Sequence, residues 1–517
     1  MVAACKGWRN AVDLHRLPAG TCCPAFAADS WHGLAPLPPQ LQSRDEIGMG
    51  NERWRRHRWE CDNPSVWRER TRPMSINISS WLNKEIIPRR MEAGASLFAR
   101  KVHRILGVLF LLVLCSFAVW RIWLHWDVNR RLARIHAAGL PINGEELNAW
   151  RERVPNTENG ALVMTQAFRL LCTFPDKRSN EVTRFRLLLT RTNHWPSATK
   201  QLVKAYVQTN VPAMAKAREA LQLSRFCYPI DFRTGFETKL PHDDSLREMA
   251  HIIELQAALN ADAGHADEWP KQVEFLLKLA NTVEGEPTLF SYSIRNAIIN
   301  MAVGITERSL NQTTLQEEMC DELQREFTHI AQTNFLPRAL AGERALMIPV
   351  FPRGLIGFLE RDLDFYLDRM ETMMSLAALP SPACLTMTNV LNAAFETGSN
   401  RFLTLSGLAL SSLQGTVLSG AYMQTHARLA TTALAVERFR QKQGQLPKNL
   451  KELVPRFLRE VPTDPFDGKP LRYRRLASGY VVYSVGADGH DDGGRERPER
   501  KKFYDNSTYD ITFIVER

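Results

Sequence analysis

The segment Ile105–Trp120, ILGVLFLLVLCSFAVW, decides how this chain is interpreted, because it contains no charged side chain. A helix needs ~20 apolar residues to cross a bilayer, so the span must continue past Arg121, whose long side chain can reach the lipid headgroups. Lys101 and Arg104 lie just before the segment, and residues that favour the membrane interface lie at its other end: Trp120, Trp123 and Trp126. The sequence therefore predicts a transmembrane anchor at residues 100–126 rather than a buried core helix.

The charges that flank the anchor give a slight preference for an N-terminus inside the cell. Basic residues stand on both sides of it: Arg89, Arg90, Arg100, Lys101 and Arg104 before, and Arg121, Arg130, Arg131 and Arg134 after. Bulky residues at the end of the segment argue against cleavage by a signal peptidase. We therefore expect a single-pass protein of the inner (cytoplasmic) membrane, held by an uncleaved signal anchor, with the bulk of the chain in the periplasm.

Residues 1–90 are the predicted leader. Residues 1–73 show no helical or strand period beyond a turn, and arginine and tryptophan gather between Arg53 and Arg72. One interpretation is an arm that binds phosphates, which the net charge of +10 would allow. We favour a disordered leader, or translated upstream sequence before a start at Met74 or Met91. The expected partner of this basic part of the chain is then the lipid bilayer and not nucleic acid.

Residues 127–422 carry a succession of helical patterns separated by short polar breaks. Asp243–Ala263 has apolar side chains close to a 3.6-residue stripe, and Glu284–Pro287 is a Gly/Pro break before the next helix. We expect an α-helical array or bundle. Leu403–Met423 is uncharged but rich in serine, so we interpret it as a buried helix of this body, with a second membrane span as the alternative.

The helical body contains no familiar catalytic motif. The sequence lacks G-x-S-x-G, H-E-x-x-H and G-x-x-x-x-G-K-[ST], and its histidines are scattered. Glu343 and Arg344 lie between leucines and form either a buried pair or, as we expect, part of a solvated helix face. Two disulfides or four free thiols are compatible with the cysteines beyond the anchor: Cys172, Cys227, Cys320 and Cys384. We therefore predict no catalytic residue and favour a protein that is not an enzyme.

Residues 423–517 change pattern and predict a small α+β head. Ala427–Lys442 has apolar residues on one face, and a short second helix opens at Leu446. Short apolar runs predict three strands of one antiparallel sheet: Leu471–Arg475, Tyr480–Val485 and Asp510–Val515. The expected fold is thus mainly α, with an N-terminal transmembrane helix, an α-helical array or bundle, and a small C-terminal α+β head with a three-stranded antiparallel sheet.

Glycine, proline and aspartate recur at characteristic spacings in residues 443–494, QGQLPKNLKELVPRFLREVPTDPFDGKPLRYRRLASGYVVYSVGADGHDDGG. The matching positions are Gly444, Pro447, Leu450, Leu453, Pro455, Pro462, Asp464, Pro465, Gly468, Pro470, Tyr473, Ser484, Gly486, Asp488, Gly489, Gly493 and Gly494, with Asp510 and Ile511 later in the chain. This pattern resembles the globular C-terminal domain of type II secretion major pseudopilins. The whole chain also resembles large membrane proteins of planctomycete and verrucomicrobial type. The prepilin-peptidase site of pseudopilins is absent before the hydrophobic segment, which argues against assembly into a filament.

The pseudopilin resemblance implies a calcium site in the loop after the second strand. Asp488, Asp491, Asp492 and Asp510 would supply carboxylate oxygens, which are the ligands that calcium prefers. The alternative is a solvated acidic turn. No other cofactor is expected.

These features together predict a membrane-anchored, non-enzymatic envelope protein with a pseudopilin-like interaction head and a scaffold or partner-binding role. Its expected partners are the bilayer and other envelope proteins. Two alternatives stay open, namely an enzyme with an active cleft in the helical body and a subunit of a secretion system. A deep pocket in the body that gathers carboxylate, histidine and arginine side chains with shifted pKa values would favour the enzyme.

Overall fold

The computed structural model describes residues 89–172, 195–265, 267–351, 357–387, 389–393, 404–497 and 509–517. All but the last two residues of the predicted leader lie outside this part of the chain. The chain divides into two units, Pro36–Ile122 and a larger unit that includes Trp123–Arg517, and each is described by itself. As predicted, the described residues are mainly α-helical, with one three-stranded antiparallel sheet near the C-terminus.

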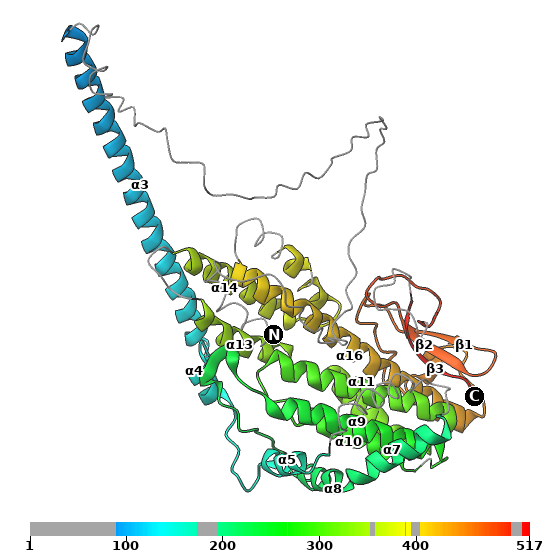
Figure 1. Cartoon of the computed structure of the whole chain (residues 1–517). Helices are drawn as coiled ribbons and strands as arrows, with labels where there is room; N and C mark the ends of the chain where they lie inside the picture. The colour runs from blue at the N-terminus through cyan, green and yellow to red at the C-terminus, as the bar shows by residue number, and fades with distance from the viewer. Residues whose placement is uncertain are drawn as a thin grey trace, which may run out of the picture. The chain divides into compact units, whose positions relative to one another are not determined.

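Helix α3, Arg89–Ala137, contains the predicted anchor, residues 100–126, most of which lies in its part before Trp123 (Figure 1). The apolar side chains of this part point outward on every side of the helix, and Phe110 and Val113 are both 65% exposed. Apolar surface of this extent is unfavourable in water and favourable in a hydrocarbon layer. The stretch Phe98–Ala137 is long and apolar enough to cross a membrane.

The part of α3 after Trp123 belongs to the larger unit and becomes one-sided. Leu124, Val128 and Leu132 recur every fourth residue and are buried. They pack in one apolar cluster with side chains of α14, Phe358–Ala377, and α16, Thr404–Gln443. The same helix therefore exposes apolar residues on all sides before Trp123, whereas after it Leu124, Val128 and Leu132 are buried on one side.

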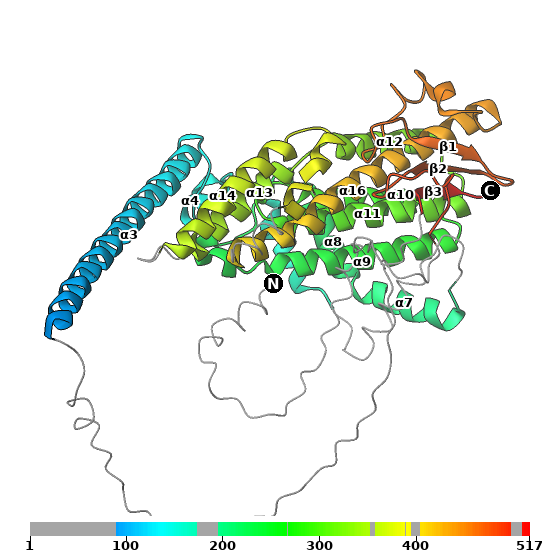
Figure 2. The same ribbon diagram turned by 90° about the horizontal axis from the view of Figure 1, so that it is seen from above.

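The helical body follows from Trp123 onward. Its further α-helices are α4 (Gly144–Trp150), α5 (Gly160–Arg169), α7 (Ser197–Thr209), α8 (Val211–Ala220), α9 (Pro241–Asp262), α10 (Trp269–Asn281), α11 (Leu289–Gln312), α12 (Glu317–Gln332) and α13 (Leu336–Met347). Short 3₁₀ helices lie at η1 (Phe232–Glu237), η2 (Ile348–Val350), η3 (Ala383–Leu385) and η4 (Leu450–Leu453). Helices α9, α11 and α16 run side by side through its centre (Figure 2).

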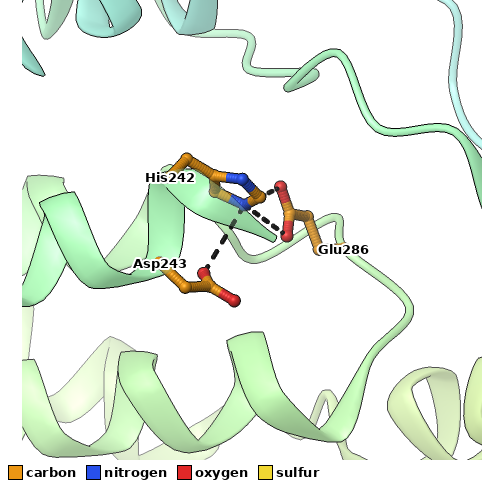
Figure 3. A group of neighbouring side chains, drawn as sticks. All are labelled: His242, Asp243 and Glu286. Carbon is orange, nitrogen blue, oxygen red and sulfur yellow. Dashed lines mark hydrogen bonds and ion pairs between the residues drawn. The ribbon is translucent and has the colours of Figure 1, made fainter. Parts of the chain in front are cut away.

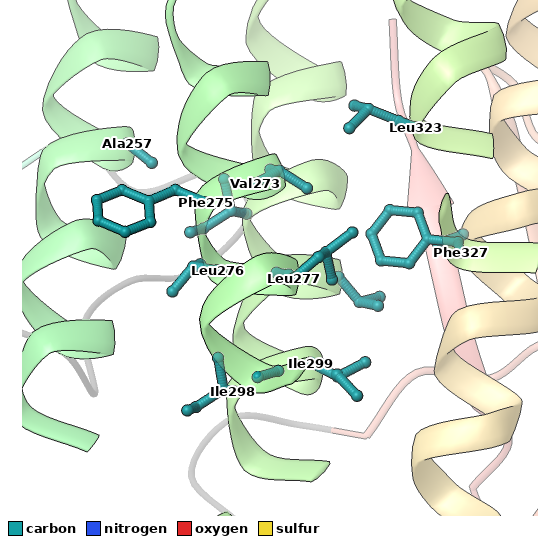
Figure 4. Packing of buried hydrophobic residues seen from close by; sticks show 14 of the residues in the cluster. Ala257, Val273, Phe275, Leu276, Leu277, Ile298, Ile299, Leu323 and Phe327 are labelled. Atoms are coloured by element: carbon teal, nitrogen blue, oxygen red, sulfur yellow. The ribbon is translucent and has the colours of Figure 1, made fainter. Parts of the chain in front are cut away.

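The main core lies between these helices and is built from the apolar stripes that the sequence predicts. In α9, the predicted stripe residues Leu246, Met249 and Ile253 are fully buried. Figure 4 shows side chains of α10 and α11, such as Leu276 and Ile298, meeting in the same cluster. Burying one such side chain contributes about 1.5–3 kcal/mol, so the stripes account for most of the attraction between the helices.

The sheet of the C-terminal head has the strand order β1 (Arg472–Arg475), β2 (Tyr480–Ser484) and β3 (Ile511–Val515). Both pairs are antiparallel, as expected. Gly479 has φ +84° in the turn between β1 and β2, and a Cβ there would lie 1.7 Å from the carbonyl oxygen of Val515. The predicted short second helix is a four-residue 3₁₀ helix, η4, instead of an α-helix.

The head and the helical body share one hydrophobic core. Helix α16 runs unbroken through the predicted boundary at residues 422–423, and the cluster that contains Phe327 of α12 also contains Phe513 of β3. Polar contacts join the same two parts, because Asn311 Nδ2 donates to the carbonyl oxygen of Ile514 over 2.7 Å. The head is therefore packed against the body and not merely attached to it by a linker.

Candidate functional site

In the described residues, His242, Asp243 and Glu286 form one group of histidine and carboxylate side chains whose polar atoms lie close enough to share a metal ion (Figure 3). His242 and Asp243 lie in the first turn of α9, directly after Pro241, which favours the start of a helix. Glu286 lies in the Gly/Pro break between α10 and α11. Packing of α9 against α10 and α11 brings the three side chains together although 44 residues separate His242 from Glu286.

The three side chains are almost completely enclosed. Asp243 is 0% exposed, and His242 and Glu286 are each 6% exposed. His242 Nε2 lies 2.9 and 3.0 Å from the two carboxylate oxygens of Glu286 and 3.5 Å from Asp243 Oδ1. A single ring nitrogen therefore faces two buried carboxylates.

A second layer of side chains fixes the orientation of this cluster. Ser291 Oγ lies 3.0 Å from Asp243 Oδ2 and 2.7 Å from Glu286 Oε2. Thr288 caps the N-terminus of α11 and donates its hydroxyl to Ser291 Oγ over 2.8 Å. The ring of Tyr228 stacks on the imidazole of His242, with 4.2 Å between centroids. The cluster is thus held from three sides.

The burial of the cluster changes how its groups titrate. Burial raises the pKa of Asp243 to about 7, because the charged form of a carboxyl group is poorly solvated there. Burial alone would lower the pKa of His242, but the hydrogen bond and negative charge of Glu286, together with Asp243, outweigh it and raise that pKa. Proton sharing within the cluster is therefore possible near neutral pH.

A cavity of about 760 Å³ opens beside the cluster, and Glu286 is part of its wall. Its walls come from the end of α4 and the residues after it, the segment 221–227 after α8, the end of α10, the break between α10 and α11, and the start of α13. Among the lining residues, Arg225 is paired with Glu152 over 2.6 Å and also contacts Glu158. Those charges are thus already compensated.

Two other arginines of the cavity wall are held without a carboxylate. Arg151 donates to the carbonyl oxygens of Tyr228 and Ile230, over 2.7 and 3.3 Å. Arg338 donates to the carbonyl oxygen of Gly285 over 3.0 Å and lies over the ring of Trp150, 4.4 Å from its centroid. Neither forms an ion pair with any carboxylate in the described part of the chain, so their positive charges remain available.

A third arginine lies directly behind the same wall. Arg295 of α11 is 2% exposed, donates to Asn281 Oδ1 over 3.2 Å, and lies 4.8 Å from the ring centroid of Phe335. Asn281 and Phe335 both line the cavity. Arg295 Nε and Nη1 have no hydrogen-bond acceptor among the described residues. A buried guanidinium group with unused donors is costly unless an anion or water compensates it.

The aspartates of the predicted calcium site lie in the loop that follows β2 and at the start of β3. Asp510 accepts hydrogen bonds from the backbone of Gly494 and Asp492, and Asp491 accepts one from Gly493. Asp488 accepts one from His490. In the described residues these four side chains do not form a group as close as the His242 cluster. Calcium binding here stays a prediction.

The sequence offered only weak signals for the observed site. Glu286 was expected to be an ordinary loop residue, and its burial depends on contacts between helices that are distant in the sequence. Arg344, expected on a solvated face, is 3% exposed and contacts Met374 Sδ instead of Glu343. That expectation was wrong, because the face of α13 that carries Arg344 packs against α14. The four cysteines beyond the anchor are free thiols.

Comparison of the chain with protein-family models, curated proteins and solved structures gives no match. Any functional conclusion therefore depends on the chemistry of the site itself.

Proposed function

We propose that this chain is a membrane-anchored protein whose helical body binds a small acidic molecule that carries a carboxylate or phosphate group. The observation that supports this proposal is the set of three guanidinium groups around one cavity that have no carboxylate partner in the described residues: Arg151, Arg295 and Arg338. Guanidinium groups bind carboxylates and phosphates through two parallel hydrogen bonds.

The charge balance of the cavity favours an anion. Three carboxylates also line it, but Glu152 is paired with Arg225 and Glu286 with His242. Glu284 is then the remaining opposing charge, against the three arginines. Because several positive charges line one cleft, each acts more strongly on an anion there than a single charge would on a flat surface.

An enzyme that acts on the same acidic molecule is the second candidate. Carboxylate and arginine side chains line the cavity, and Glu286 of its wall contacts the buried His242. The pKa values of His242 and Asp243 are both raised. This is the combination that separates an active cleft from a purely structural body. A head that binds other envelope proteins is compatible with either candidate.

The experiment for the ligand is a calorimetric titration of the full chain in detergent micelles with inorganic phosphate and, separately, with succinate. We expect binding of at least one probe, weakened at least 10-fold by Arg338→Gln and by Arg151→Gln. The matched control is Arg325→Gln on α12, whose side chain is 73% exposed and pairs with Asp321 at the surface. Equal affinities for the natural chain and its three variants would overturn the proposal. So would the absence of binding of either probe to the natural chain.

We further propose that the anchor holds the protein in the inner membrane, with the residues beyond it in the periplasm. The support is the exposed apolar surface of α3, together with the slight excess of basic residues on the N-terminal side of the anchor. Protease treatment of spheroplasts that carry a C-terminal epitope tag tests this placement. The tag should be digested without lysis, and a tag that survives until lysis would reverse the orientation.

A further inference from the structure

We propose that His242, Asp243 and Glu286 form a site for one divalent transition-metal ion of the zinc class. This inference stands apart from the proposed anion site, because it depends on the ligand atoms of the cluster and not on the arginines. The three side chains point toward a common centre from the start of α9 and from the break between α10 and α11 (Figure 3). Each offers one ligand atom, and these atoms all lie within 4.8 Å of one another.

The spacing of the ligand atoms matches a coordination sphere. Two ligands that each lie ~2.0–2.1 Å from a tetrahedral zinc ion are ~3.3 Å apart. His242 Nε2 lies 2.9 Å from Glu286 Oε1 and 3.5 Å from Asp243 Oδ1. The three side chains would therefore need only small rotations to take up a metal ion between them.

Two buried oxygen atoms of the cluster accept no well-aligned hydrogen bond in the described residues and face only His242 Nε2, 3.5 and 2.9 Å away. They are Asp243 Oδ1 and Glu286 Oε1, and both belong to side chains that are more than nine-tenths buried. A single proton on His242 Nε2 cannot satisfy both carboxylates. Buried acceptors normally have a partner, so these two atoms point to a cation between them.

The charge of the cluster also favours a divalent ion. A metal ion would displace the protons that the raised pKa values of His242 and Asp243 keep on the cluster. The two carboxylates and the neutral imidazole then carry a charge of −2, which one divalent cation cancels inside a protein interior. Imidazole is a preferred ligand of zinc and iron, whereas magnesium and calcium prefer all-oxygen sites. Arg151 acts against a cation here, because its positive charge also reaches His242.

The second layer is of the kind that supports metal ligands. Ser291 lies within hydrogen-bond distance of both carboxylates, and Thr288 in turn donates to Ser291. Such outer hydrogen bonds orient ligands before the ion arrives. Three protein ligands also leave one position for water or for a group of a molecule in the neighbouring cavity, whereas a closed structural zinc site has four.

The test uses the full chain in detergent micelles, with a purification tag that contains no histidine. After treatment with a chelator, the protein is titrated with zinc chloride alone and, in parallel, with cobalt chloride to record the visible absorption of a low-symmetry cobalt site. We expect one zinc equivalent per chain that raises the melting temperature, and a cobalt band in the visible range. Asp243→Asn and Glu286→Gln keep the size of each side chain and should each weaken this equivalent at least 10-fold.

The matched control is Glu284→Gln, two residues away in the same break, which should bind zinc like the natural chain. Weaker zinc sites at the acidic loop after β2 would persist in all variants and are thereby recognised. Equal zinc binding in Asp243→Asn, Glu286→Gln and the natural chain would overturn the proposal. If those variants fail to fold, a melting temperature of the natural chain that zinc and chelator leave unchanged, together with no cobalt band, overturns it as well. Phosphate binding is measured separately on the metal-free protein. It reports on the anion site alone, so failure of the metal site and failure of the anion site can be told apart.

Discussion

Helices α3 and α16 each contain a long uncharged stretch, but the two stretches differ in how they distribute their apolar surface. In α3, residues 105–119 are exposed on all sides, and Leu111 is 60% exposed. In α16, Leu410, Leu413 and Val417 are buried at helical spacing, whereas Leu408 is 57% exposed. Serine, glycine and threonine lie between these buried side chains, at positions such as Ser411, Gly415 and Thr416. A helix that is apolar around its whole circumference suits lipid, whereas a helix with one buried apolar face suits a protein core.

The two helices also differ in how closely other elements approach them. A Cβ added to Gly420 of α16 would lie 2.2 Å from the hydroxyl oxygen of Tyr292, whereas one added to Gly107 of α3 would meet nothing within 4 Å. Small residues in α16 therefore allow α11 to pack closely. In α3 a small residue has no such role in the protein itself.

The largest effect expected from this comparison is on the stability of the body. Leu413→Ala removes a side chain that is 1% exposed and leaves a cavity, which should cost about 2–5 kcal/mol. Leu111→Ala, the same change in α3, should leave the unfolding of the body unchanged. Chemical denaturation in detergent micelles measures both. Similar losses in the two variants would contradict the distinction between the helices.

The next effect concerns membrane insertion. Leu111→Arg places a charge near the middle of the predicted span, at a cost of about 2.5–3.5 kcal/mol on insertion scales. The variant should move out of the membrane fraction or be degraded. Leu408→Arg, at an exposed position of α16, should remain in the membrane fraction at the natural level. An equal loss for Leu408→Arg would support the second membrane span that the sequence left open.

His426 lies in α16 and makes the stability of the packed body dependent on pH. Burial lowers the pKa of His426 from 6.5 to about 4, and its Nδ1 lies 3.0 Å from Asn300 Oδ1. As the pH falls, the unfolded chain therefore binds a proton at His426 before the folded chain does. The free energy of unfolding decreases as the pH drops from 6.5 towards 4 and then levels off. At pH 4 the loss should reach about 1–3 kcal/mol relative to neutral pH.

The measurement is denaturant unfolding of the natural chain and His426→Gln at several pH values. The glutamine variant lacks this titration, so the difference in stability between the two proteins should change only within that window. A constant difference from pH 7 to pH 4 would show that His426 is solvated.

The smallest effects come from two glycines of α16. Gly420→Ala should destabilise the body by about 1–3 kcal/mol, because Tyr292 is packed and must shift. Gly407→Ala meets nothing within 4 Å and should stabilise the helix by about 0.5–1 kcal/mol. Melting temperatures in detergent compare the two. A destabilising Gly407→Ala would mean that another element contacts this position.

The parts of the fold that the sequence predicted well are those in which local pattern and tertiary packing agree. The stripe in α9 placed that helix at Asp243–Ala263, and the structure has Pro241–Asp262. The three strands of the head lie where alternation and turns placed them. The boundary between body and head has no such local signal, because α16 is continuous and the two parts share a core.

The candidate site was not predicted, for a physical reason. Asp243 was placed at the start of a helix and Glu286 in a break between helices, and both interpretations are locally correct. His242 was one of the scattered histidines without an assigned role. Their proximity arises from the packing of α9 against α10 and α11, which spacing along the chain does not encode. The arginines around the cavity come from α4, α11 and α13 in the same way.

The continuity of α16 has a mechanical consequence. At ~1.5 Å per residue, its 40 residues form a rod of ~60 Å. Near Leu413 this rod packs in the cluster shared with α14, and near Ala433 it accepts a hydrogen bond from Tyr480 of the sheet. A helix resists bending far more than a loop does. A displacement of the sheet would therefore be transmitted along α16 to the helices packed around Leu413, including α14.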